Sequence, residues 1–128
     1  MNGVNGAIVL PDNWSTPQGI SFTPSTTQGL ADQSTYYDNP NDDNFSHNTY
    51  TDEQWSVMEF AGAVFFPAAG ERNGRSVNAV GSDGYYWSAT PDINTAFGFN
   101  LGSRYFCPQG YNGNSWGRWW GLSVRLVR

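Results

Sequence analysis

The sequence has few charged residues, and most of its charge is negative. Charged residues make up 13% of the 128 residues, and six basic residues face eleven acidic ones, which gives a net charge of −5. Nucleic-acid binding requires clustered basic residues that neutralise phosphates, whereas the basic residues of this chain are scattered along it. The composition therefore argues against a nucleic-acid partner.

Cysteine and histidine are almost absent. The single cysteine, Cys107, allows no intrachain disulfide and no cysteine-rich metal site. His47 is the one histidine and lies in a polar segment, so it adds no tetrahedral metal site. Proton transfer and nucleophilic attack need a His, Cys, Lys or carboxylate with a positioned partner. We therefore expect a protein that is not an enzyme and has no metal or cofactor.

Long apolar runs are missing too. No stretch of about eighteen apolar residues occurs, so no membrane-spanning helix is expected. The first residues lack the basic and apolar regions of a signal peptide. The length fits one domain with a single core. Because the chain starts abruptly in Gly and Asn, we expect a single domain over residues 1–128 that was cut from a longer protein.

Aromatic residues, in contrast, are abundant at 16% of the chain. In residues 94–120 they are mixed with Asn, Ser, Gly and Arg, between strand-like anchors at residues 84–90 and 121–127. Tyr and Trp offer large, stiff contact areas, and Asn, Ser and Gly offer adaptable hydrogen bonds, which is the composition of an antibody paratope. This stretch therefore predicts a binding surface.

The alternative is that these aromatic residues form the core. If half of the six aromatic residues in the second part of the stretch face outward, they expose about 450 to 750 Å². Ordinary monomers seldom carry an apolar patch above roughly 300 to 600 Å² without a function. Strand alternation sends about half of the side chains outward, so we favour the binding surface. The six residues are Tyr105, Phe106, Tyr111, Trp116, Trp119 and Trp120.

Local patterns predict mostly antiparallel strands with one helix. Thr51 and Gln54 have the capping-box spacing of a helix N-terminus, and Gly62 is suited to end that helix. Asn73-Gly74 is typical of a hairpin turn. Together these elements predict an α+β fold. Strands are expected at residues 7–10, 63–66, 85–89, 96–101 and 123–127.

The periodicity also predicts which side chains face the core. On the helix, Trp55, Met58 and Gly62 mark one face, with Val57, Phe60 and Ala61 beside it, and we expect the helix to pack against the sheet. In the last strand we expect Val124 and Leu126 to face inward. Alternation along residues 96–101 separates Phe97, Phe99 and Leu101 from Ala96, Gly98 and Asn100.

Residues 15–48 form a long polar segment, which reads mostly as loop. Its acidic part, residues 38–44, offers hard oxygen ligands of the kind that calcium prefers. That part lacks the spaced pattern of an EF-hand loop, and Asn and Asp are common in turns. We favour a solvated turn, with calcium binding as the alternative.

Five blocks of the sequence occur together in a fixed order: NGAIVLPDNW at residues 5–14, WSVME at 55–59, GAVFFPAAGER at 62–72, GYYWSAT at 84–90 and GLSVRLV at 121–127. In this combination the chain resembles the C-type-lectin-fold variable proteins of diversity-generating retroelements, and related surface-protein domains of gut bacteria and their phages. The match covers the chain except roughly residues 15–48. The resemblance implies a C-type-lectin-like fold with short antiparallel strands, one or two helices and long loops.

In that family, error-prone reverse transcription replaces adenines of a template and so diversifies codons of a C-terminal region on a fixed scaffold. The resemblance implies a hypervariable ligand-binding region at about residues 92–122. It also implies an extracellular location on a cell surface or virion, and a protein or glycan ligand on a host or neighbouring cell, without membrane insertion by this domain. The positions that it makes variable are Asn94, Phe97, Gly98, Asn100, Gly102, Arg104, Tyr105, Cys107, Tyr111, Asn112, Asn114, Trp116, Arg118, Trp119 and Trp120.

The tryptophans depart from the simplest form of this scheme. Adenine changes convert an AAC codon to many residue types but never to Trp. Trp116, Trp119 and Trp120 therefore need Arg or Lys template codons, or they are fixed residues. The scaffold positions implied by the resemblance are Ala96, Phe99, Leu101, Gly121 and residues 123–127.

Three other functions stay open as alternatives. A bacterial surface adhesin or fimbrial tip domain without diversification has the same scaffold. A calcium-dependent sugar-binding lectin would lose glycan binding in the presence of a chelator. An enzyme of the related formylglycine-generating fold would need redox-active or copper-binding cysteines, and the chain has only Cys107.

Overall fold

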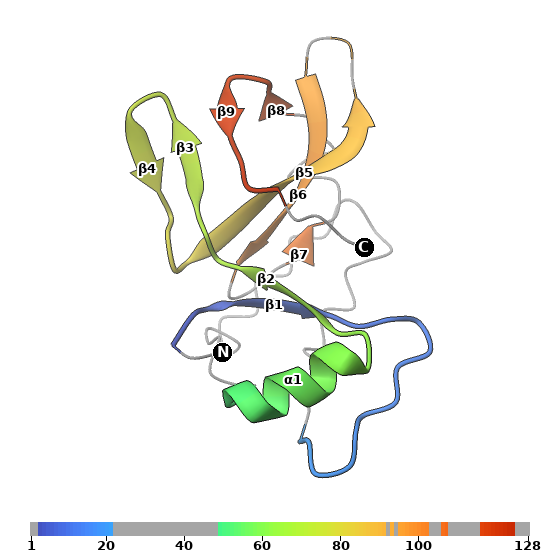
Figure 1. Cartoon of the computed structure of the whole chain (residues 1–128). Helices are drawn as coiled ribbons and strands as arrows, with labels where there is room; N and C mark the ends of the chain where they lie inside the picture. The colour runs from blue at the N-terminus through green and yellow to red at the C-terminus, as the bar shows by residue number, and fades with distance from the viewer. Residues whose placement is uncertain are drawn as a thin grey trace.

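The computed structural model describes residues 3–21, 49–91, 93, 95–102, 106–107 and 116–124 (Figure 1). Within these residues the strand pairs are antiparallel and lie in open sheets beside one helix, which confirms the predicted α+β class. The elements are β1 (Gly6–Val9), α1 (Asp52–Phe60), β2 (Val64–Pro67), β3 (Glu71–Asn73), β4 (Ser76–Asn78), β5 (Asp83–Pro91), β6 (Thr95–Gly102), β7 (Phe106–Cys107), β8 (Trp116–Gly117) and β9 (Trp120–Gly121).

Helix α1 begins and ends where the sequence predicts. The Thr51 hydroxyl accepts a hydrogen bond from the Gln54 backbone N–H at 3.3 Å, and the Gln54 side chain accepts one from the Thr51 N–H at 3.0 Å, which is a complete capping box. Hydrogen bonds from its own backbone N–H and from Thr51 lower the pKa of Glu53. Gly62 follows the helix with a φ of 99° and so ends it.

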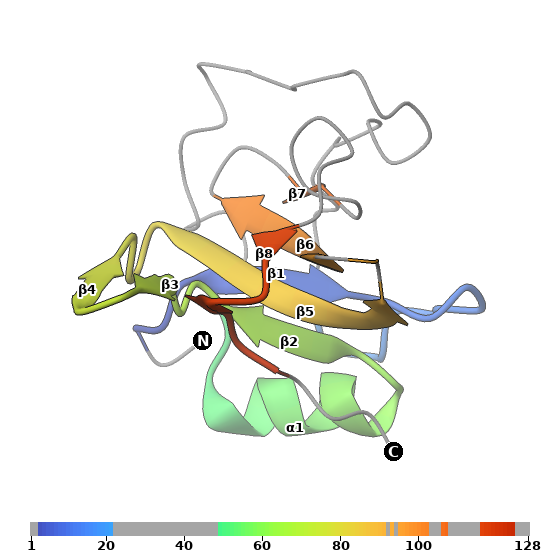
Figure 2. The same ribbon diagram turned by 90° about the horizontal axis from the view of Figure 1, so that it is seen from above.

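Strands β1 and β2 pair between two layers and bury both of their faces. The register sets Ala7 opposite Phe66 and Ile8 opposite Phe65. Because successive side chains of a strand point to opposite faces, Ile8 and Phe65 face α1, whereas Ala7 and Phe66 face the sheet of β5 and β6. Helix, two-stranded sheet and longer sheet are therefore stacked in three layers (Figures 1 and 2).

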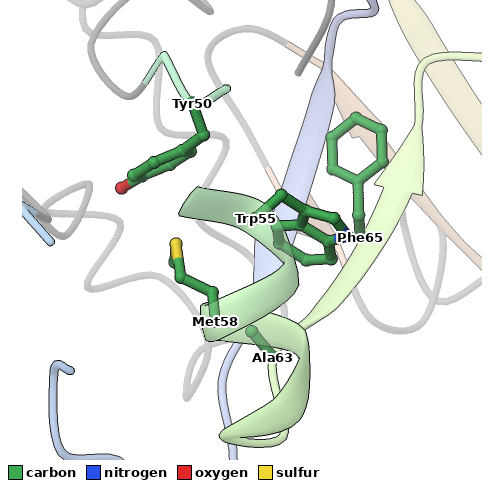
Figure 3. Packing of buried hydrophobic residues seen from close by; sticks show 5 residues of the cluster. All are labelled: Tyr50, Trp55, Met58, Ala63 and Phe65. Atoms are coloured by element: carbon green, nitrogen blue, oxygen red, sulfur yellow. The ribbon is translucent and has the colours of Figure 1, made fainter. Parts of the chain in front are cut away.

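The first core cluster lies between α1 and the β1–β2 pair (Figure 3). Met58 is fully buried, and the ring of Trp55 meets that of Phe65 edge-on, with centroids 5.9 Å apart. Tyr50 closes the cluster and donates its hydroxyl to the Ser21 carbonyl at 3.1 Å, and burial raises its pKa. The burial predicted for Trp55 and Met58 is thus confirmed, whereas Gly62 is exposed, as are Val57 (46%) and Phe60 (96%), which were expected beside that face.

The second core cluster lies between β2 and the β5–β6 pair. Tyr86 and Phe99 are opposite each other in the register and their rings stack 5.0 Å apart, with Phe66 edge-on to both. The Tyr86 hydroxyl donates to the Pro67 carbonyl at 2.6 Å. Leu101, on the same face as Phe99, is fully buried. The predicted separation of Phe99 and Leu101 from Gly98 and Asn100 is confirmed.

The chain after β9 differs from the prediction. Ser123 forms a single parallel bridge with Tyr86, through hydrogen bonds from its N–H to the Tyr85 carbonyl and from the Trp87 N–H to its own carbonyl. Val124 was expected to face inward, but it is 65% exposed, and the inward side chain is Leu122 at 8% exposure. A single bridge does not hold the backbone to the period of two that a strand imposes. Leu126 lies outside the described residues.

Candidate binding surface

Three connections of the chain lie at the end of the protein that is farthest from α1, with the one between β8 and β9 in the middle (Figure 1). They are Gly74–Arg75 between β3 and β4, the region of Ile93 between β5 and β6, and Arg118–Trp119 between β8 and β9. We call the exposed residues Arg72, Arg75, Ile93, Arg118 and Trp119 the tip surface.

The turn between β8 and β9 brings the other two turns together. Strand β8 pairs with the first residues of β6, with Thr95 opposite Gly117. Strand β9 pairs with β3, with Asn73 opposite Trp120. Arg118 and Trp119 therefore lie where the two sheets join, next to the turn at Ile93 on one side and the turn at Gly74 on the other. Backbone pairing, and not a flexible loop alone, sets the position of these two residues.

Among the described aromatic residues that were predicted to bind a ligand, Trp119 is the most exposed. Its side chain is 75% exposed. The indole lies over Gly117 and occupies the space that a side chain at that position would need. The backbone of Gly117 thus supports one side of the ring, while most of its surface faces solvent. This is the arrangement of an aromatic contact residue with a restricted orientation.

Trp116 and Trp120 are half-buried, so each packs against the protein with one part of its ring and exposes the other part to a ligand. The Trp116 ring lies against Gly98, where an added Cβ would come within 2.9 Å of its Cζ3 atom. It also meets the Tyr85 ring edge-on at a centroid distance of 6.2 Å. Trp116 is therefore held by the outer face of the β5–β6 sheet.

The arginines of the tip surface are oriented by backbone carbonyls. Arg118 Nε donates to the Thr95 carbonyl at 3.1 Å, and Arg72 Nε donates to the Gly74 carbonyl at 3.0 Å. The side-chain stem of Arg72 also lies along Gly121, where an added Cβ would come within 3.0 Å of its own Cβ. These contacts restrict the guanidinium groups before any partner binds, which reduces the entropy lost on binding.

Two of the positions expected to be variable lie inside the protein. Gly98 is buried between the Tyr86 carbonyl and Trp116. Asn100 is 7% exposed, and its Oδ1 atom accepts no hydrogen bond from the part of the chain that the structure describes. Their burial places these two side chains away from direct ligand contact. Phe97 and Gly102 are half-buried.

Several other expected variable positions lie outside the described residues, or only their backbone is described. Cys107 belongs to β7, opposite Asn100, and its side chain is not described. Residues 38–44, the alternative calcium loop, are outside the described residues as well. The remaining variable positions outside the described residues are Asn94, Arg104, Tyr105, Tyr111, Asn112 and Asn114.

The structure adds three residues that the sequence analysis did not place in the site. Arg72, Arg75 and Ile93 lie at the tip surface, whereas the sequence analysis identified only the turn at Asn73-Gly74, between the first two. In the sequence, Arg72 and Arg118 are far apart, and nothing in the pattern of either segment indicates that β3 and β9 pair. The predicted hairpin at Asn73-Gly74 is confirmed, with Gly74 and Arg75 as its two loop residues.

The described parts of the chain contain no group of metal ligands and no helix that could span a membrane. No three His, Cys, Asp or Glu residues come together there as a metal site. Helix α1, with nine residues, is the helix described, and it is too short to cross a bilayer. Comparison with family models, with curated proteins and with solved structures found no match to this chain.

Proposed function

We propose that this protein is a ligand-binding domain with a C-type-lectin-like fold that displays a hypervariable surface, diversified by a retroelement, on a cell or virion. The observation that carries the proposal is the exposure of Trp119 at a turn that two sheets hold in place. An exposed Trp lowers solubility and contributes little to the core, so its presence at this turn favours a role in contact. The part of the proposal that concerns a retroelement rests on the sequence resemblance.

The proposal assigns no catalytic activity to the protein. The tip surface consists of guanidinium, indole and aliphatic groups, which bind and orient but do not exchange protons near neutral pH. Indole and guanidinium side chains are also the types that dominate the binding energy of protein interfaces. The site is therefore suited to recognition, with the ligand held by aromatic contact and charge-assisted hydrogen bonds.

One observation favours the second candidate, an adhesin or fimbrial tip domain of the same scaffold without diversification. Gly98 and Asn100 lie where a displayed variable residue is not expected, because both are buried. Random replacement at a buried position commonly costs about 1 to 3 kcal/mol in folding free energy. A lineage that diversified these two codons would produce many unstable variants.

The DNA around the gene distinguishes the two candidates. For a diversified domain we expect a nearby reverse transcriptase gene and a second copy of the segment that encodes residues 85–128, with differences at adenines. We also expect the codons of Arg118 and Trp119 to differ between the copies, and those of Tyr86 and Leu101 to be identical. A gene without such a copy would refute diversification and leave the adhesin as the remaining candidate.

A further inference from the structure

The exposed charges of the described residues are divided between the two ends of the protein. Arg72, Arg75 and Arg118 are all exposed, and all belong to the tip surface. The opposite end carries the exposed carboxylates of Asp12, Asp52, Glu53 and Glu59, on α1 and on the segment after β1. Glu71 and Asp83, the two described carboxylates nearer the tips, are half-buried. Among the described residues, the tip surface therefore carries a local excess of positive charge in a protein whose net charge is −5. Asp92, which adjoins Ile93 in the chain, lies outside the described residues.

From this separation we infer that the tip surface binds an acidic polypeptide segment, with its carboxylates on Arg72, Arg75 and Arg118 and an apolar side chain on Trp119. This inference rests on the proposed function and assigns the chemistry of its ligand. Guanidinium groups bind carboxylates through paired hydrogen bonds. Trp and Arg, side by side, are the residues most often found at the energetic centres of protein interfaces.

The distribution of the arginines favours a polypeptide over a polyanion. Nucleic acids and highly sulfated glycans carry closely spaced charges and require a continuous basic stripe. Here the three arginines are separated by Trp119, Ile93 and the uncharged pair Asn73 and Gly74. The rest of the protein is acidic and would repel an extended polyanion. A segment with a few carboxylates around an apolar side chain matches the spacing of this surface better.

The test is a selection from a displayed library of random peptides, with the whole 128-residue chain as bait. We expect the selected peptides to be enriched in Asp and Glu relative to the input library, with an apolar residue among them. A synthetic copy of the most enriched peptide then serves as the probe for affinity measurements. Its affinity should fall as salt rises, because the arginines are exposed.

Charge-matched variants separate the tip surface from overall charge. The double variant Arg75→Gln/Arg118→Gln and the control Asn13→Asp/Gln18→Glu each lower the net charge by two, and the control residues are exposed near the acidic end. We expect the arginine variant to bind the probe at least about tenfold more weakly and the control to stay within about threefold. Arg75→Gln alone, at an exposed position of the β3–β4 turn, should weaken binding about threefold and keep the wild-type melting temperature.

Every other result overturns the inference. Peptides without acidic enrichment, or equal binding by the arginine variant, would refute it, and tighter binding of heparin than of the probe would assign the surface to a sulfated glycan. Oligomers of the chain that dissociate in the arginine variant would make a second copy the partner. If Trp119→Ala abolishes binding while the arginine variant retains it, only the charge assignment fails. If both variants bind normally, the charge assignment and the proposed function of this surface both fail.

Discussion

The two ends of the protein use the same residue type for different purposes. Trp55, in α1, is 7% exposed and packs edge-on against Phe65, whereas Trp119, at the tip surface, is 75% exposed. Trp55 lies on a helix face that a sheet covers, and Trp119 lies on a turn between two sheets. The difference teaches that the layer to which a residue belongs, and not its hydrophobicity, decides whether it stabilises the fold or is available to a ligand.

The end of the protein that contains α1 should tolerate substitution poorly in its buried core. Met58→Ala removes most of a fully buried side chain and is expected to lower the free energy of unfolding by about 2 to 5 kcal/mol. Phe60→Ala, two residues further along the helix at 96% exposure, should change this free energy by less than about 0.5 kcal/mol. Urea denaturation followed by tryptophan fluorescence measures both values. Equal effects of the two substitutions would mean that α1 does not pack on β1 and β2 as described.

The next largest effect is expected where the two regions meet, at Gly98. In Gly98→Ala the added methyl group would contact the Tyr86 carbonyl and the Trp116 ring, so we expect a loss of about 1 to 3 kcal/mol. The loss should persist in a Trp116→Ala background, because the nearest obstacle is backbone. Urea denaturation of the single and double variants gives the values. An unchanged stability would return Gly98 to the set of tolerant, variable positions.

The helix cap predicts a smaller loss that is local to α1. Thr51→Ala removes the hydroxyl that accepts from the Gln54 N–H and should lower the unfolding free energy by about 0.5 to 2 kcal/mol. Thr51→Ser keeps the hydroxyl and serves as the control. Hydrogen exchange of the first amides of α1 should rise in the alanine variant only. Protection that is the same in both variants would argue that packing alone maintains the N-terminal turn.

The smallest effect on stability is expected at Trp119. Trp119→Ala should change the unfolding free energy by no more than about 0.5 kcal/mol, since three quarters of the side chain already faces solvent. Ligand binding should fall by about 2 kcal/mol or more if the residue is an energetic centre of the interface. Calorimetric melting and binding measured on the same preparations compare the two effects. A large drop in melting temperature would assign Trp119 to the core and end the contrast between the two regions.

Much of the fold was predictable because it depends on neighbours in the sequence. The capping box involves Thr51 and Gln54, three residues apart, and the hairpin of β3 and β4 needs only a two-residue turn. Alternation along β6 correctly separated Phe99 from Gly98. It did not show that both faces of this strand would be covered. Asn100, which the resemblance makes a variable position, is therefore buried without any sign of this in the sequence.

The sequence by itself therefore determined the helix with its buried residues Trp55 and Met58, most of the strands and the two faces of β6. It also contained the exposed Trp119 as part of an aromatic stretch with the composition of a paratope. Only the tertiary structure decided that Arg72 and Arg75 lie at the same end of the protein as Arg118. The physical reason is that local propensity acts over a few residues, whereas the pairing of β3 with β9 joins segments almost fifty residues apart, and only backbone hydrogen bonds between them can bring these charges together.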